Sequence, residues 1–270
     1  KDAIQKGINE ICFTDHVDYG VRDDWDSGKP IIYRDGSAIV NVNYPLYVKQ
    51  ISELQKKYSK DISIKLGLEF GIQTHTIPQY EALFKKYPFD FTLELEYHLI
   101  DNEIKEVYRV INKDNVMMHF SIGGHPAFVT PENDASMAGC KIRFDADRIT
   151  YHLIGDYQLM AREEYELPLI NHEYTIQEDS FEKDAFIIEG SQAGTVSLIK
   201  NEKPFVTVKF DTPVFGLWSC KSKNVPFVCI EPWYGRTDAI DFTGELKDRE
   251  YSNHLDAGEV FEKSFSILFY

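Results

Sequence analysis

The chain has 270 residues, of which 43% are apolar and 14% aromatic, which is enough for a packed core and too much for a disordered protein. Its net charge of −15 argues against nucleic acid and membrane surfaces as partners, because both are bound through clustered Lys and Arg. No apolar run approaches the roughly 18 residues of a membrane span, and the four widely spaced cysteines suggest neither a disulfide framework nor a zinc ribbon, so we expect a cytoplasmic protein.

The first third of the chain alternates between strand and helix patterns. In chain order the pattern predicts a helix over 1–10, a strand over 11–13, a loop over 14–30, a helix over 45–58, a strand over 62–71 and a helix over 79–85. This alternation is typical of α/β structure. Because Lys1 stands in what reads as the middle of a helix, we also expect the chain to be a fragment.

After Phe91 the apolar residues alternate with period two, which indicates half-buried strands. The turn Asp101-Asn102 separates the first two of them. Further short strands are predicted at 141–145, 151–154, 195–199, 205–210, 226–233 and 264–270. The sequence therefore predicts a mainly β chain, with an α/β segment over 1–91 followed by a large antiparallel β-sandwich over 92–270, which also carries most of the negative charge.

The α/β segment places polar residues at the ends of predicted strands. Asp15 and His16 follow the first strand, and Glu69 ends another. Imidazole and carboxylate groups there suit a divalent metal, although solvated loop residues would show the same pattern.

The surrounding sequence EICFTDHVDYGV, NVNYP and IKLGLEFGIQTHTI resembles the histidinol-phosphatase branch of the polymerase-and-histidinol-phosphatase (PHP) family. That resemblance implies a truncated barrel in which His16 and Glu69 descend from metal ligands. The family's other ligands would precede Lys1 or follow Phe91, so we expect an incomplete site. A divalent metal and a metal-dependent histidinol-phosphate phosphatase activity are implied only if this remnant is functional.

Two motifs carry candidate chemistry in the β-rich part. FSIGGHPAF, residues 120–128, uses paired glycines to deliver His125 at a strand end. PFVCIEPWYGRTD, residues 226–238, ends an apolar strand at Glu231, where burial should raise the carboxyl pKa towards that of a general base. From the residues alone, His125 and Glu231 could equally have structural roles instead of catalytic ones.

Residues 87–270 resemble the aldose 1-epimerase (galactose mutarotase-like) family, most closely its LacX-like branch, through YPFDF, VINKD, FSIGGHPAF, GLWS and FVCIEPWYGR. The resemblance implies a β-sandwich enzyme that interconverts sugar anomers without a cofactor, with His125 as general acid and Glu231 as general base. It implies sugar contacts for Phe128, Trp218, Trp233, Arg236 and Asp238.

The family's N-terminal half is replaced here by PHP-like sequence, so we expect an incomplete sandwich with open edges. Whether it is an active isomerase or a carbohydrate-binding protein without catalysis stays open. Both resemblances include YPFDF, residues 87–91, which suggests a chimeric chain joined there, as a genuine fusion or a sequence-assembly artefact.

Overall fold

The computed structural model describes residues 1–5, 7–8, 10–34, 36–71, 74–87, 89–132, 134–155, 158–220 and 226–270. The chain forms two compact units, Lys1–Phe91 and Thr92–Tyr270. None of the helices in these described ranges is long and apolar enough to cross a membrane.

The first unit is α/β. Its elements are α1 (Asp2–Gln5), β1 (Glu10–Phe13), β2 (His16–Val17), β3 (Ile32–Arg34), β4 (Ser37–Ile39), α2 (Tyr44–Lys57), β5 (Ser63–Leu66), β6 (Glu69–Phe70), the 3₁₀ turn η1 (Thr74–Thr76) and α3 (Ile77–Lys86). Strand β1 pairs in parallel with β5, and β2 in parallel with β6. The expected α/β pattern is therefore present, with differences in the extent of its elements.

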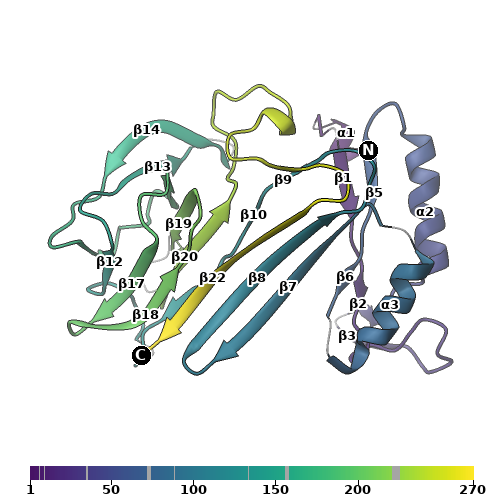
Figure 1. The fold of residues 1–270 in the computed structure, drawn as a ribbon, viewed down its shortest axis with the longest axis horizontal. Coiled ribbons are helices and arrows are strands. Elements are labelled where there is room, and N and C mark those ends of the chain that lie inside the picture. Colours follow the sequence, from purple (N-terminus) through teal and green to yellow (C-terminus); the bar gives the residue numbers. More distant parts are fainter. Residues whose placement is uncertain are drawn as a thin grey trace. The chain divides into compact units, whose positions relative to one another are not determined.

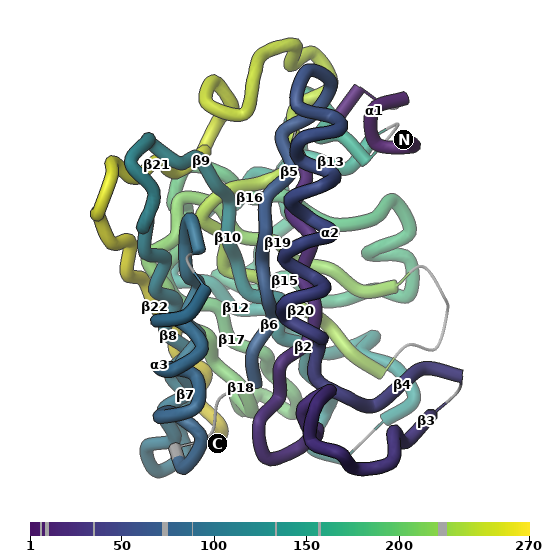
Figure 2. Tube along the Cα trace, turned by 90° about the vertical axis from the view of Figure 1, so that its right-hand side faces the viewer, coloured from purple at the N-terminus to yellow at the C-terminus, as the bar shows by residue number. Residues whose placement is uncertain are grey.

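Local chemistry explains where α2 lies. The Asn43 side chain accepts a hydrogen bond from the backbone N–H of Leu46, which caps the helix start. The apolar stripe of the helix then packs Ile51 against Ile62 and Ile64 at β5. Figures 1 and 2 both show α2 running alongside β5.

Three predicted elements of this unit differ from the observed ones. The helix expected over 1–10 ends within its first turns, because Gly7 has a φ of +73° and donates to the carbonyl of Ile4. The strand expected over 62–71 is divided into β5 and β6 around Gly67, where a β-carbon would lie 2.8 Å from Cys12 Sγ. The predicted loop over 14–30 contains the short strand β2.

The second unit is built from strands. They are β7 (Phe91–Ile100), β8 (Glu103–Asn112), β9 (Met118–Phe120), β10 (Ile122–Gly123), β11 (Ala127–Val129), β12 (Lys141–Phe144), β13 (Thr150–Ile154), β14 (Met160–Glu166), β15 (Glu173–Thr175), β16 (Phe186–Glu189), β17 (Thr195–Lys200), β18 (Lys203–Lys209), β19 (Val214–Trp218), β20 (Phe227–Tyr234), β21 (Asn253–Leu255) and β22 (Val260–Phe269), with a 3₁₀ turn η3 (Leu246–Asp248).

Within the described residues, most of these strands form two seven-stranded sheets. One has the order β10-β20-β19-β16-β13-β14, with β11 also pairing β20; the other has the order β15-β12-β17-β18-β22-β8-β7. Their inner faces share one apolar core that includes Phe215, Ile230, Val208 and Phe265. The mainly β, sandwich-like fold expected from period-two alternation is confirmed, and Figure 1 shows the long strands β7, β8 and β22 side by side.

Strand β7 forms an edge of its sheet with an uncovered apolar row. The Tyr97 side chain lies beside Glu106, and Glu106 pairs in register with the core residue Phe265, so the odd-numbered residues of β7 continue the core-facing side of the sheet. The exposed members of this row are Leu93, Leu95, Tyr97 and Leu99. The inner face of the sheet therefore extends beyond the part that is buried.

Candidate active site of the second unit

Strand β20 presents two different faces. Val228 and Ile230 lie in the sandwich core, and the residues alternating with them, Cys229, Glu231 and Trp233, point to the opposite face. The flanking strands β11 and β19 pair along β20, so the strand is central at this point and its backbone is held on both sides. Glu231 is therefore carried by a rigid, buried backbone.

Two prolines interrupt the strand pairing beside Glu231 without shifting its register. Strand β10 pairs with residues 233–234 and β11 with residues 227–229, and the same register continues through residues 124–126, which lie opposite 230–232. Two backbone hydrogen bonds hold this segment, from Gly124 N to Pro232 O at 2.9 Å and from Ile230 N to Pro126 O at 3.3 Å, and the prolines have no N–H to complete the ladder. His125 therefore stands directly opposite Glu231 on the same face of the sheet.

Gly124 is required for this geometry. A β-carbon at residue 124 would lie 2.6 Å from the Tyr108 hydroxyl and 2.8 Å from the Phe265 ring, both parts of the core. Because only glycine lets the backbone come so close to that core, the paired glycines of the FSIGGHPAF motif acquire a structural explanation.

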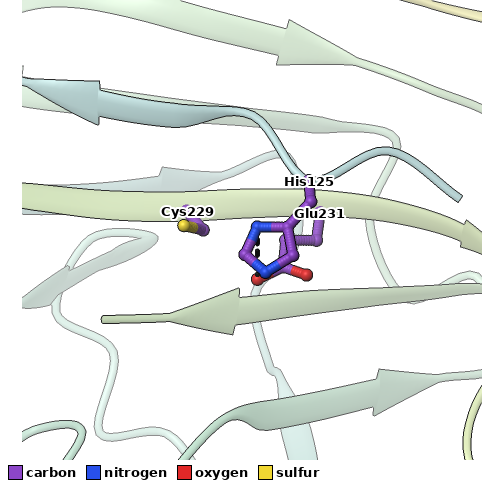
Figure 3. Close-up of side chains that lie close together, drawn as sticks. All are labelled: His125, Cys229 and Glu231. Atoms are coloured by element: carbon purple, nitrogen blue, oxygen red, sulfur yellow. Dashed lines mark ion pairs between the residues drawn. The ribbon is translucent and has the colours of Figure 1, made fainter. Parts of the chain in front are cut away.

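The two candidate catalytic groups meet at short range. His125 Nδ1 lies 3.5 Å from Glu231 Oε1, and the two side chains are 62% and 4% exposed (Figure 3). The imidazole ring also stands edge-on to the Trp218 indole, with ring centroids 5.7 Å apart. An accessible proton carrier thus stands beside a buried carboxyl group.

The surroundings of Glu231 change its acidity. Burial raises the pKa of this carboxyl to about 7, and a hydrogen bond from the Trp233 side chain opposes that rise. Gly216 makes room for the indole, because a β-carbon there would lie 2.6 Å from the Trp233 ring. A carboxyl group that titrates near neutrality can both accept and return a proton.

Cys229 is a neighbour of this pair that the sequence analysis missed. It precedes Glu231 by two residues on the same face of β20, and burial raises the pKa of its thiol to about 12. Ligand atoms of His125, Cys229 and Glu231 all lie within 4.8 Å of one another (Figure 3). Strand alternation in FVCIEPW was the signal that could have identified it.

His152 also shares the face of Glu231. Register links the two residues across the sheet, from Glu231 to Gly216, from Gly216 to Ile187 and from Ile187 to His152. The His152 Nε2 atom lies 3.8 Å from a Glu189 carboxylate oxygen, and its side chain is largely buried. His152 is therefore a largely buried member of this face.

The structure does not bring all predicted sugar contacts to this site. Phe128 pairs with Val228 and lies in the core, which corrects its assignment as a contact for sugar. Arg236, whose side chain is 1% exposed, is bound by Glu189, Glu250 and the carbonyl of Thr237.

Asp238 accepts hydrogen bonds from Arg249 Nε at 2.6 Å and Nη2 at 2.9 Å. Arg236 and Asp238 were expected to bind sugar hydroxyls. In the structure, ion pairs within the protein occupy their polar atoms instead. Trp218 and Trp233 are half-buried and lie beside the candidate catalytic residues.

In the first unit, His16 and Glu69 are paired across β2 and β6. His16 Nε2 lies 3.8 Å from Glu69 Oε2, whereas the nearby Asp18 carboxylate is engaged by Arg22 and by the N–H of Gly71. Among the residues that the structure describes, no third acidic, thiol or imidazole ligand completes a compact cluster with these two. The donor set therefore does not fit a closed PHP metal site.

Comparison with known proteins finds both resemblances. The PHP domain family matches residues 1–166, a range that continues past Phe91 into the second unit. A histidinol-phosphatase from Lactococcus lactis subsp. lactis is 31% identical over 103 residues, which cover 38% of this chain and 33% of that protein. The chromosomal protein LacX of Lactococcus lactis subsp. lactis is 24% identical over 205 residues, which cover 72% of this chain and 67% of LacX.

The chain superposes on the crystal structure of a galactose mutarotase-related enzyme from Lactobacillus acidophilus with a TM-score of 0.60 and 30% sequence identity. The match covers 70% of this chain and 65% of the Lactobacillus acidophilus chain. The chain thus spans one third of the histidinol-phosphatase and about two thirds of the other two proteins. It has the galactose mutarotase-like fold in its β-rich part, and by the match of residues 1–166 it belongs to the PHP domain family.

Proposed function

We propose that the second unit is a carbohydrate-binding isomerase of the aldose 1-epimerase type, which interconverts the anomers of an aldose. The observation that carries this proposal is the pair of Glu231 and His125, a buried carboxyl with a pKa of about 7 beside an accessible imidazole. The similarity to a galactose mutarotase-related enzyme supports the same reaction class.

The reaction needs one base and one acid. The Glu231 carboxylate takes the proton of the C1 hydroxyl, the bond between C1 and the ring oxygen breaks, and that oxygen takes a proton from His125. Rotation about the C1–C2 bond exposes the other face of the aldehyde, and ring closure returns both protons. Because the two side chains supply both proton transfers, the proposal needs no cofactor.

The sugar is proposed to bind against aromatic side chains. Trp218 stands edge-on to His125, and Trp233 lies next to Glu231, so both indoles are close to the reacting atoms. Apolar ring faces suit the C–H side of a pyranose, and the polar groups at the site suit its hydroxyls. The proposed partner is therefore a small neutral sugar in the cytoplasm.

Polarimetry tests this function. Freshly dissolved α-D-galactose or α-D-glucose should reach its equilibrium rotation faster with the protein than without it. The matched comparison is Glu231→Gln, which keeps the size of the side chain and removes the base. If neither sugar is accelerated, the isomerase activity is excluded for these sugars. Sugar binding that survives in Glu231→Gln without turnover in either protein would favour a non-catalytic carbohydrate-binding protein.

A metal-dependent histidinol-phosphate phosphatase is the second candidate function. It is favoured by the family match, whereas His16 and Glu69 lack a third ligand among the described residues. Metal analysis of purified protein, with phosphate release from histidinol phosphate, distinguishes it from the isomerase. Phosphate release that is lost in His16→Ala and kept in His125→Ala would support it.

We also propose that the chain is chimeric, with its join at residues 87–91. Support comes from the similarity of parts of the chain to two different proteins, a histidinol-phosphatase and LacX. Nucleotide reads spanning codons 80 to 100 test this. Reads that continue in either parent gene without crossing the join would identify an assembly artefact.

A further inference from the structure

His125, Cys229 and Glu231 present three different kinds of metal ligand to one point in space. An imidazole nitrogen, a thiol sulfur and a carboxylate oxygen lie within 4.8 Å of one another, and Figure 3 shows the three side chains near one another. The proposed isomerase reaction uses the histidine and the glutamate, and leaves the buried thiol without a role.

The spacing fits tetrahedral coordination. Zinc binds nitrogen and oxygen at about 2.1 Å and sulfur at about 2.3 Å, which puts neighbouring ligand atoms roughly 3.4–3.8 Å apart. His125 Nδ1 and Glu231 Oε1, at 3.5 Å, already have that separation. The remaining pairs need to close by about 1 Å, which rotation of the exposed imidazole can supply for His125 and Cys229, and rotation of the carboxylate for Cys229 and Glu231.

The two strand residues are held in place. Cys229 and Glu231 are buried on the central strand β20, two residues apart, so alternation fixes both side chains on the same face. His125 comes from the segment between β10 and β11, directly opposite Glu231, and leaves one side of the cluster open to solvent. This resembles zinc sites with three protein ligands and one open position.

We propose that His125, Cys229 and Glu231 bind a thiophilic divalent cation such as Zn²⁺, and that the bound cation switches off the isomerase. The inhibition rests on the proposed isomerase function, whereas the metal binding does not. The metal–sulfur bond forms as the Cys229 S–H bond breaks and its proton goes to water, with no change in oxidation state. The same cation occupies the lone pair of the imidazole and the carboxylate oxygen, so neither group can transfer a proton to the sugar.

Cobalt reports the predicted sulfur ligand directly. Titration of the full chain with Co²⁺ should give a thiolate-to-cobalt charge-transfer band that saturates at one ion per chain and disappears when Zn²⁺ is added. The band should be lost in Cys229→Ala and retained in Cys140→Ala, a control that removes another buried thiol. It should also persist in Cys12→Ala and in His16→Ala, which rules out an origin in the first unit.

His125→Ala provides a second test that leaves the core untouched, because the side chain is mostly exposed. Its Co²⁺ affinity should fall by more than about tenfold, since removing even a partner of a metal ligand costs about 10- to 100-fold. A titration without the charge-transfer band, or a band that persists in Cys229→Ala, would overturn the proposed site.

The activity measurement separates the two proposals. In a protein that accelerates mutarotation, Zn²⁺ should inhibit with the same midpoint as the cobalt titration, and EDTA should restore the rate. Inhibition that survives in Cys229→Ala contradicts the switch. A cobalt band in a protein without mutarotation would instead leave the metal site standing and the proposed function refuted.

Discussion

His125 Nδ1 lies 3.5 Å from Glu231 Oε1, and the first side chain is open to solvent while the second is almost completely buried. Burial makes the carboxyl a stronger base than a solvated glutamate, and exposure lets the imidazole exchange protons with water. The two groups stand opposite each other, on β20 and on the segment between β10 and β11.

Replacing Glu231 by Gln should lower the rate of mutarotation by about 10²- to 10⁴-fold, because a positioned general base contributes about that much. The rate is measured by polarimetry after subtraction of the spontaneous reaction. Glu178→Gln, on the surface, is the matched control and should retain the rate. A Glu231→Gln protein with the full rate would mean that another group is the base.

The rate should rise with pH up to about 7, because only the ionised Glu231 can accept the C1 proton and burial raises its pKa to about 7. It should not keep rising at higher pH, because His125 must carry a proton to act as the acid. Below about pH 7 the rate should fall by about tenfold for each pH unit. Polarimetry at constant ionic strength between pH 5 and 8 measures this profile. A flat profile over this range would contradict a titrating carboxyl as the base.

Gly216→Ala should reduce the rate by displacing the Trp233 indole, since the new β-carbon would lie 2.6 Å from the ring. Loss of the indole hydrogen bond should also move the midpoint of the pH–rate profile upwards, because that bond lowers the pKa of Glu231. Gly155→Ala is the control, as a β-carbon there meets its neighbours at ordinary distances of 3.6 Å and more. An unchanged midpoint in Gly216→Ala would show that Trp233 does not affect the pKa of Glu231.

Arg236→Ala should lower the free energy of unfolding by about 1–3 kcal/mol, because it takes the guanidinium partner from Glu189, whereas Glu250 keeps its pair with Arg162. Urea unfolding measures this loss. Arg148→Ala removes an exposed pair with Glu166 and should cost less than about 1 kcal/mol. If the Arg236→Ala protein is as stable as the wild type but binds sugar more weakly, Arg236 contacts the sugar after all.

Leu99→Lys should reduce self-association, because Leu99 is 78% exposed in the uncovered apolar row of the edge strand β7. Light scattering over a range of protein concentrations measures this effect. Leu246→Lys changes an exposed leucine in η3 and should leave association as it was. Equal scattering by the wild type and Leu99→Lys would show that β7 is not the surface responsible.

Much of the fold could be predicted from local patterns. Period-two alternation located the strands around β7, β8, β12 and β17, a longer apolar run located β20, and helical spacing located α2. Strands β14, β16 and β19 were not predicted as strands, although β16 and β19 are almost continuously buried. Apolar residues on both faces leave no alternation to detect in such central strands, and the runs of β16 and β19 are shorter than that of β20.

The candidate site was predictable where its signal lay in short motifs. His125 and Glu231 stand in such motifs, and the structure places them together. Phe128 and Arg236 stand in the same two motifs, yet the first lies in the core and the second in a buried ion-pair network. A motif identifies residues that are adjacent in the chain. It does not determine whether each side chain points into the core or towards the candidate site.

The sequence by itself determined the change from α/β to β structure, the strand that carries Glu231 and the glycines that admit His125, because these depend on residues adjacent in the chain. Only the tertiary structure decided that Cys229 joins this pair, that Gly216 makes space for Trp233 and that Arg236 is held by Glu189 and Glu250. These contacts depend on pairing between distant strands, where burial and charge act across space.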